Sequence, residues 1–375
     1  MPDAILFLSP YQSVYHASYL LSAFAALKRY GWRLSIRLEP SAGSSVARLS
    51  INGTLYGIDL HDSDTRYCAS SLARCDFYAK RSYNAAKAPA AHRAKIIPFG
   101  LNYACRSLHS TLFLARLLAV HPKALRTMHF GPYVHLPTPE EIEWPSHSPS
   151  DPLILFQTRV WPDDGLGEGD TLENINGARV TLIRELRKAF GKRFEGGLVP
   201  DEVARKRYPD LVATLPHRRR AYAALSRRFM IAIYSRGLHG SHAFKLAEYL
   251  ASSKCIVGEP LGGTLQYPLE TGRNYIPFRA VDDCLAACDA LLSNPAKANE
   301  MRRANWEYYQ RYIRYDRRIE LLANTHQEEP RPRPAHDGAG NSLGKKETEL
   351  DFPYARQCES SNGPARARTT LHDQT

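Results

Sequence analysis

Two stretches of this chain, one near its start and one near its middle, begin in the same way, and this repetition limits the possible folds. In the first, a short apolar run at 4–8 is followed by a loop and by apolar residues at helical spacing over 14–30. In the second, the run 153–156 is followed by a longer loop and an amphipathic stretch over 175–190. Continuous rather than alternating apolar strands, coupled to helices, indicate parallel sheets covered on both faces. We therefore predict an α/β protein with two domains that face each other.

Length and composition indicate where these domains end. A chain of 375 residues exceeds what one hydrophobic core usually organises. The proline-rich stretch 136–152 separates the two repeats and is typical of a linker, and the polar segment beyond 326 cannot bury enough surface to become ordered. Within the first half, Asn52-Gly53 between apolar runs predicts a two-residue hairpin turn of type I′. We predict an N-terminal domain over 1–135, a linker over 136–152, a C-terminal domain over 153–326 with a closing helix at 296–323, and a disordered tail over 327–375.

Charge and the absence of membrane signals narrow the function classes. Lys and Arg number 50 against 38 Asp and Glu, and the net charge of +12 suits an anionic partner. No apolar run approaches the roughly 20 residues that span a bilayer, and the first residues lack the pattern of a secretory signal. Seven cysteines without a CxxC pair match neither a disulfide framework nor a zinc site. We expect a cytoplasmic protein with reduced thiols, with peripheral contact to the inner membrane face as a further option.

The most informative stretch begins at Phe244. It combines a helix carrying Glu248, a buried strand, the pair Gly262-Gly263, an acidic-Gly turn at Glu270 and an Asp-Leu helix that ends in a Leu-Leu-x-x-Pro step. This order resembles the nucleotide-sugar-binding half of the group 1 glycosyltransferases, the family-4-like GT-B enzymes, over residues 229–310. The resemblance implies two facing Rossmann-like domains and a hexosyltransferase-type enzyme. It implies transfer of a sugar from a nucleotide diphosphate-sugar to a glycan or lipid-linked acceptor, with no other cofactor and no required metal.

The donor side of this predicted site follows from the resemblance and from helix physics. In the family, two glutamates eight residues apart contact the donor; Glu248 matches the later one, at the ribose, whereas Gly240 stands at the earlier position, and Arg159 matches an arginine that faces the phosphates. Independently, the loop 237–241 leads into a helix whose first turn offers N–H groups and a positive dipole end to a diphosphate, and Lys245 adds a charge one turn in. The predicted donor-binding residues are Arg159, Gly240, Ser241, Lys245, Glu248, Gly262, Gly263 and Glu270.

Simpler interpretations of the same residues remain open. Lys245 and Glu248 are also typical of an exposed helix face. Gly262-Gly263 is also typical of an ordinary turn, and Arg159 could lie at the surface without a functional role.

Three side chains are candidates for catalysis: His16, Asp62 and His242. His16 follows the first strand-to-helix loop and could act as a base or contact the sugar. Asp62 belongs to the acidic cluster at 59–64, which could supply a general base or hold a divalent cation. Because no carboxylate stands at position 240, His239 or His242 could address the sugar, and we take His242 as the candidate. The alternatives are structural histidines and turn chemistry, and the stereochemistry of transfer stays open.

Two other functions compete with this one. A nucleotide-sugar epimerase on the same scaffold would convert the donor without an acceptor. A nonenzymatic protein that binds polyanions or membranes is suggested by the arginines at 218–220 and 227–228. These arginines alternate with apolar residues, as on a helix with a solvated basic face. No nucleic-acid-binding signature accompanies them, so nucleic acid is the less favoured partner.

Overall fold

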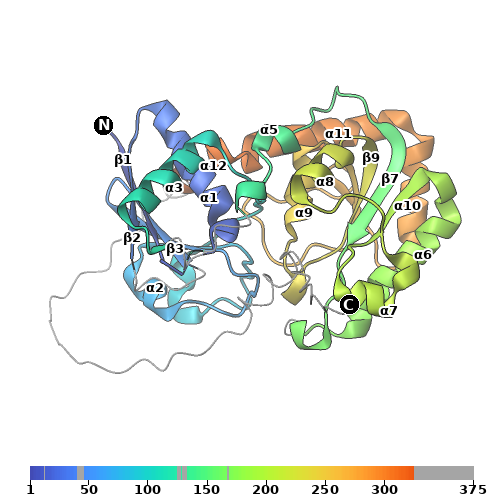
Figure 1. Ribbon diagram of the computed structural model, residues 1–375, viewed down its shortest axis with the longest axis horizontal. Helices are drawn as coiled ribbons and strands as arrows, with labels where there is room; N and C mark the ends of the chain where they lie inside the picture. Colours follow the sequence, from blue (N-terminus) through green and yellow to red (C-terminus); the bar gives the residue numbers. More distant parts are fainter. Residues whose placement is uncertain (12, 40–45, 125–127, 129–132, 167–168, 325–375) are drawn as a thin grey trace, which may run out of the picture.

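A computed structural model shows two α/β domains that lie side by side (Figure 1). This confirms the fold class predicted from the sequence. The predicted tail, 327–375, lies outside the residues that the structure describes, which are 1–11, 13–39, 46–124, 128, 133–166 and 169–324.

The N-terminal domain contains a six-stranded sheet in the order β2-β1-β3-β4-β5-β6. Only β3 runs against its neighbours. The reason is the predicted hairpin: Asn52 and Gly53 both have positive φ, at 47° and 88°, as a type I′ turn requires. The other strands therefore direct their carboxyl ends toward one edge. The elements are β1 (Asp3–Leu8), α1 (Val14–Ala26), β2 (Arg33–Leu38), β3 (Val46–Ile51), β4 (Thr54–Asp59), α2 (Ala69–Arg74), β5 (Phe77–Lys80), β6 (Ile96–Pro98) and α3 (Leu108–Val120).

The C-terminal domain follows a linker that contains α5 (Pro139–Ile142). Its five strands are all parallel, in the order β11-β10-β9-β7-β8. Every residue of β9 is buried, as expected for a continuously apolar strand covered on both faces. The elements are β7 (Asp151–Thr158), α6 (Ala178–Phe190), β8 (Phe194–Leu198), α7 (Glu202–Arg207), α8 (Arg219–Ser226), β9 (Phe229–Tyr234), α9 (Phe244–Ala251), β10 (Cys255–Gly258), β11 (Tyr275–Pro277) and α10 (Val281–Ser293).

The end of the described chain returns to the N-terminal domain, as predicted, but not as one helix. Helix α11 (Pro295–Tyr308) lies on the C-terminal domain, and a π turn leads to Arg314, whose extended backbone ends it. Helix α12 (Tyr315–Asn324) then packs against α1. At the crossing, the hydroxyl of Tyr309 lies 2.8 Å from that of Tyr103 and donates to Glu143 Oε1 at 2.8 Å. These bonds connect the N-terminal domain, the linker and the crossing segment.

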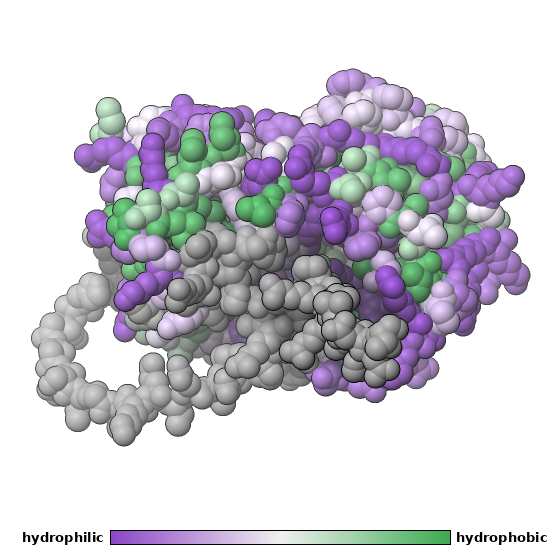
Figure 2. Space-filling model, in the orientation of Figure 1, coloured by the Kyte–Doolittle hydropathy of each residue, from purple (hydrophilic) through white to green (hydrophobic). Residues whose placement is uncertain are grey.

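The visible surface differs between the domains. Figure 2 shows hydrophilic side chains along the outer edge of the C-terminal domain and apolar ones over the N-terminal domain, where α3 lies. Leu108, Leu112 and Val120 of α3 are among the exposed apolar residues. Within the described part of the chain, each helix is too short or too polar to cross a membrane. The cysteines described there are free thiols, as predicted.

The crossing predicts a stability effect. Tyr309→Phe removes a buried hydroxyl and leaves Glu143 and Tyr103 without that partner, so we expect the free energy of unfolding to fall by about 1–3 kcal/mol. Urea titration followed by circular dichroism measures it. Tyr11→Phe is the matched control, because Tyr11 is exposed, and should change stability by less than about 0.5 kcal/mol. Equal effects of the two substitutions would contradict the proposed role of the crossing.

Candidate functional site

The carboxyl ends of the two sheets meet at a seam that Arg81 bridges. Arg81 follows β5 in the N-terminal domain and is 6% exposed. Its Nη2 donates to the carbonyl of His242, and its guanidinium lies 4.7 Å from the centre of the Phe244 ring, both in the C-terminal domain. Its Nη1 pairs with Asp62, and Nε donates to Asn102 Oδ1 at 2.8 Å. We call this region, where Arg81 meets the start of α9, the seam.

Two histidines face the seam from the N-terminal domain. His16, in the first turn of α1, places its ring 6.2 Å from that of Phe244. Burial, with the nearby charges of Arg81 and His61, lowers the His16 pKa to about 4. Burial likewise lowers the pKa of His61 to about 4, against the opposing effect of Asp59. Both imidazoles are therefore neutral near pH 7. The Nδ1 atom of His61 already accepts from the N–H of Ser63 at 2.9 Å, whereas neutral His16 can accept a hydrogen bond.

The acidic cluster at 59–64 is not a shared site. Asp59 is buried and pairs with Lys80 at 2.8 Å, Asp62 pairs with Arg81, and Asp64 pairs with Lys87. Because each carboxylate has its own cation, the interpretation as a divalent cation site is wrong. Across the described residues, no group of three or more His, Cys, Asp or Glu side chains is arranged to hold a metal ion. Asp62 still reaches the seam through Arg81, with its side chain 45% exposed.

In the loop before α9, several backbone N–H groups that we expected to face a diphosphate already donate hydrogen bonds within the protein. Gly237 N–H donates to the carbonyl of Ser241 at 2.8 Å, and Ser241 N–H donates back to Leu238 at 3.0 Å. His239 N–H donates to Asp170 Oδ2 at 2.7 Å. These donors, and with them the backbone around Gly240, hold the loop in shape. Since α9 has no side-chain cap, its own first turn remains the feature suited to an anion.

Lys245 lies in that first turn and carries a strongly perturbed charge. Its Nζ donates to the carbonyl of Gln157 at the end of β7 and lies 4.4 Å from the Tyr222 ring centre. Burial lowers the Lys245 pKa to about 7, with Glu248 opposing this shift and nearby arginines adding to it. An amine near half-protonation at neutral pH gains its full charge when an anion binds beside it.

The carboxylate of Glu248 already has a partner within the protein. Its Oε1 accepts from Arg219 Nη1 at 2.8 Å. Arg219 also lies 4.8 Å from the ring centre of Tyr15 in α1 and 5.7 Å from that of Phe244. Arg219 thus connects Glu248, the residue predicted to bind the ribose, to the N-terminal domain.

A second group of arginines joins the ends of β7 and β9. Arg179, on α6, donates to the carbonyls of Arg159 at 2.6 Å and Arg236 at 2.7 Å. Burial lowers its pKa to about 10, so it remains charged at neutral pH. Arg236 pairs with Asp170, and its N–H donates to Glu259 Oε2 at 2.6 Å. Arg159 itself is partly buried and close enough to lower the pKa of Lys245.

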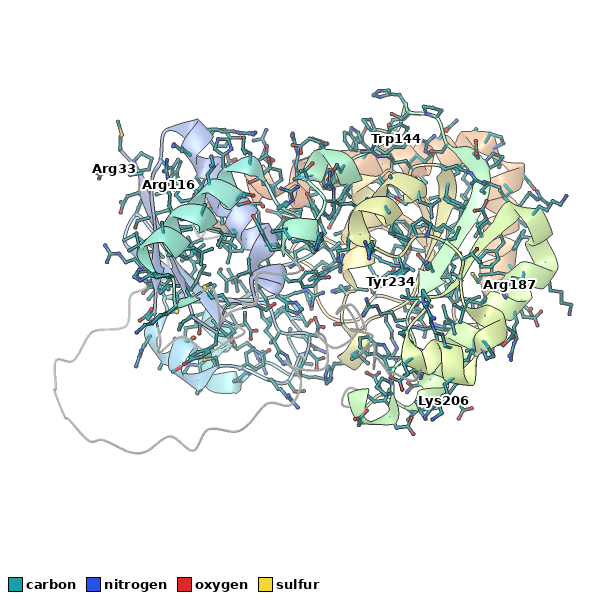
Figure 3. All side chains as sticks on the ribbon, in the orientation of Figure 1. Arg33, Arg116, Trp144, Arg187, Lys206 and Tyr234 are labelled. Carbon is teal, nitrogen blue, oxygen red and sulfur yellow. The ribbon has the colours of Figure 1, made fainter. Side chains whose placement is uncertain are left out.

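Tyr234, labelled in Figure 3, lies close enough to both groups of arginines to interact electrostatically with each. It ends β9, and both Arg81 and Arg179 act on its pKa, which burial raises. The charged groups of the seam are therefore one neighbourhood, drawn from both domains.

His242 and the glycine pair form the tightest part of the seam. His242 is 4% exposed, its Nε2 has no hydrogen-bond partner within the structure as described, and burial lowers its pKa to about 4. A Cβ on Gly262 would lie 2.6 Å from the Gly240 carbonyl oxygen, and one on Gly263 would lie 2.6 Å from that of Tyr83. The close approach that requires these glycines is thus to the protein's own backbone.

Glu270 does not reach the seam. It is exposed, pairs with Arg273 at 3.1 Å, and lies in the turn that closes at the amino end of β11. The carboxyl ends of the parallel strands lie at the opposite edge of the sheet. Its prediction as a donor ligand is therefore wrong in this structure, because an acidic-Gly turn can serve a surface loop equally well.

The expected solvated basic face is confirmed in part: Arg218, Arg220 and Arg228 are exposed, whereas Arg219 and Arg227 are half-buried. Besides Arg219, Arg220 pairs with Glu141 of the linker and Arg228 pairs with Glu195 and Asp151. Arg227 lies 5.1 Å from the ring centre of Trp144, which Figure 3 labels, and donates to the Glu140 carbonyl. Arg220 and Arg228 are therefore solvent-exposed and ion-paired at once, whereas Arg227 packs against the linker.

A cavity of about 500 Å³ lies at the carboxyl edge of the C-terminal sheet, where β8 ends. Its lining includes residues 212–215, Pro200 and His217. One of its walls is connected to Lys245: Gln157 donates to the Leu215 carbonyl at 3.3 Å and accepts from Lys245. Its volume falls within the range of roughly 300–1,000 Å³ that is usual for ligand pockets.

Comparison with known proteins identifies the class of the C-terminal domain. Residues 172–324 match the family described as glycosyl transferase-like. This confirms the predicted resemblance and the glycosyltransferase class for that segment. No curated protein matches the chain.

Solved structures similar to this chain include the C-terminal domain of a group 1 family glycosyl transferase from Francisella tularensis, with 11% identity, coverage of 46% of this chain and 97% of that one, and a TM-score of 0.32. Sucrose-phosphate synthase from Thermosynechococcus elongatus has 12% identity, coverage of 86% and 98%, and a TM-score of 0.39. UDP-GlcNAc 2-epimerase from Neisseria meningitidis, bound to UDP-GlcNAc, has 11% identity, coverage of 72% and 69%, and a TM-score of 0.35. At such low TM-scores we draw nothing further from them.

Because the pKa of Lys245 is depressed in the folded protein, we expect this residue to lower the free energy of unfolding by an amount that depends on pH. Between pH 7 and the ordinary pKa of 10.5, the unfolded chain binds more protons at this amine than the folded chain. The contribution of Lys245 to the free energy of unfolding therefore rises with pH across that window. Lys245→Met should therefore raise the free energy of unfolding most near pH 7, with the gain shrinking toward about pH 10. Chemical denaturation at several pH values measures this, with exposed Lys188→Met as control. A gain that stays constant with pH would argue against an amine whose pKa is depressed in the folded protein.

Proposed function

We propose that this protein is a glycosyltransferase of hexosyltransferase type that moves a sugar from a nucleoside diphosphate-sugar to the hydroxyl of a glycan or lipid-linked acceptor. The observation that carries this proposal is the excess of cations at the seam, most of it within or beside the matched segment. The cations are Arg81, Arg159, Arg179, Arg219, Arg236 and Lys245, and the carboxylates are Asp62, Asp170, Glu248 and Glu259. Such an excess suits a diphosphate.

The chemistry assigned to these groups is stabilisation of the leaving group. Negative charge grows on the diphosphate as the sugar departs, and preorganised cations in a site of low dielectric stabilise it there. Lys245, at the first turn of α9, and Arg159 are the proposed phosphate ligands. The 500 Å³ cavity beside Gln157 offers space for the nucleoside. Glu248 would hold the ribose hydroxyls when Arg219, its present partner, turns toward the phosphates.

The N-terminal domain would supply the acceptor side. His16 is neutral near pH 7 and faces α9 across the seam, so it can accept a hydrogen bond from the acceptor hydroxyl. Asp62 adds a carboxylate whose side chain is 45% exposed. His242, with its unpartnered Nε2, is the proposed contact for the sugar. Closure of the two domains would exclude water and limit donor hydrolysis.

A binding experiment tests the donor site. Lys245→Met should weaken nucleoside diphosphate binding about tenfold or more, because a charge-assisted hydrogen bond is lost, while the fold remains intact. Calorimetry with uridine, guanosine and adenosine diphosphates measures this, with Lys188→Met as the matched control in the same domain. If both variants bind like the parent protein, the proposed donor site is wrong.

The reaction class has its own test. With a nucleotide sugar and an acceptor, the proposal expects acceptor-dependent release of nucleoside diphosphate. Conversion of the nucleotide sugar to an epimer without any acceptor, seen by proton NMR, would instead favour the epimerase function.

A further inference from the structure

Arg318 of α12 is a buried cation that has no counter-charge among the residues that the structure describes. It is 2% exposed, and neither its Nε nor its Nη2 has a hydrogen-bond partner in the described part of the chain. Its neighbours on the same segment do have carboxylate partners: Arg314 pairs with Glu143 and Arg317 with Glu320. No carboxylate among the described residues forms an ion pair with Arg318.

The surroundings of Arg318 are aromatic rather than acidic. The guanidinium lies 4.6 Å from the ring centre of Phe99. Burial lowers its pKa, and the side chains that oppose this shift include the tyrosines Tyr19, Tyr308 and Tyr267. The hydroxyls of Tyr19 and Tyr308 already donate to backbone carbonyls. A buried charge without compensation is costly, so this position favours an added negative charge.

A small cavity adjoins the guanidinium. It measures about 10 Å³, which is room for one water-sized particle. Gly100 after β6, Tyr267 of the C-terminal domain, Tyr312 of the crossing segment and Arg318 are among the residues that line it. A Cβ on Gly100, whose φ is +81°, would lie 3.1 Å from Arg318 Nη2, so a glycine here leaves space beside the charge.

We propose that this cavity binds a single small monovalent anion, chloride in ordinary solutions, held by Nε and Nη2 of Arg318. The charge argues for an anion rather than water, and the volume argues for a monatomic ion rather than phosphate, sulfate or a carboxylate ligand. None of the cations assigned to the donor lines this cavity. The site is thus separate from the proposed reaction and stands whether or not the chain transfers a sugar.

Such an ion stabilises the arrangement of the domains. The cavity is formed by the N-terminal domain, a loop of the C-terminal domain and the segment that crosses between them. An ion that binds only this arrangement raises the stability of the folded chain as its concentration rises.

Thermal unfolding in chloride tests this proposal. At constant ionic strength, replacing sodium gluconate with sodium chloride should raise the unfolding temperature of the full chain by a few degrees. Arg318→Met should lose this response, whereas Arg317→Met should keep it, since Arg317 is exposed on the same helix. An equal response in the parent protein and Arg318→Met, or no response in the parent protein, overturns the proposal.

Diffraction tests it without any substitution. Crystals of the parent protein grown in sodium bromide should show an anomalous peak within hydrogen-bonding distance of Arg318 Nε and Nη2. Absence of that peak, with water or nothing in the cavity, overturns the proposal even if chloride changes the unfolding temperature.

Discussion

The return of the chain from the C-terminal to the N-terminal domain is the constraint on which the rest of the structure depends. At the crossing, Tyr309 connects Tyr103 of one domain to Glu143 of the linker, and α12 then joins the core of the N-terminal domain. With the domains held this way, the carboxyl ends of two largely parallel sheets face each other. The loops and the first turns of the helices at these ends carry the side chains to which we assign the proposed chemistry.

The charges at the seam follow from that geometry. Arg81 reaches from the N-terminal domain to the backbone just before α9, and Arg219 reaches from α8 to Tyr15 of α1. Each of these cations contacts the opposite domain, so the contact between the domains also brings positive charges together at the seam. Burial then depresses the pKa of Lys245 to about 7. Together these effects concentrate positive charge at the place where we propose that a diphosphate binds.

Local patterns in the sequence predicted the fold well and the site only in part. The two strand-loop-helix openings and the Asn52-Gly53 turn depend on neighbouring residues, and the structure confirms them. Arg179 and Asp170 were missed because nothing nearby in sequence marks them; they act by reaching backbone at the ends of distant strands. Glu270 was predicted from its motif, but the motif does not say which edge of the sheet its turn occupies. The end of the helical segment at Arg314 could not be predicted either, because the helical spacing of apolar residues continues through that position.

The most direct test of the account is a crystal structure of the protein with a nucleoside diphosphate. The account predicts that the diphosphate lies at the first turn of α9, with its oxygens within hydrogen-bonding distance of Lys245 Nζ and the Arg159 guanidinium. A diphosphate bound elsewhere on the protein, with Lys245 still bound to the Gln157 carbonyl, would contradict it.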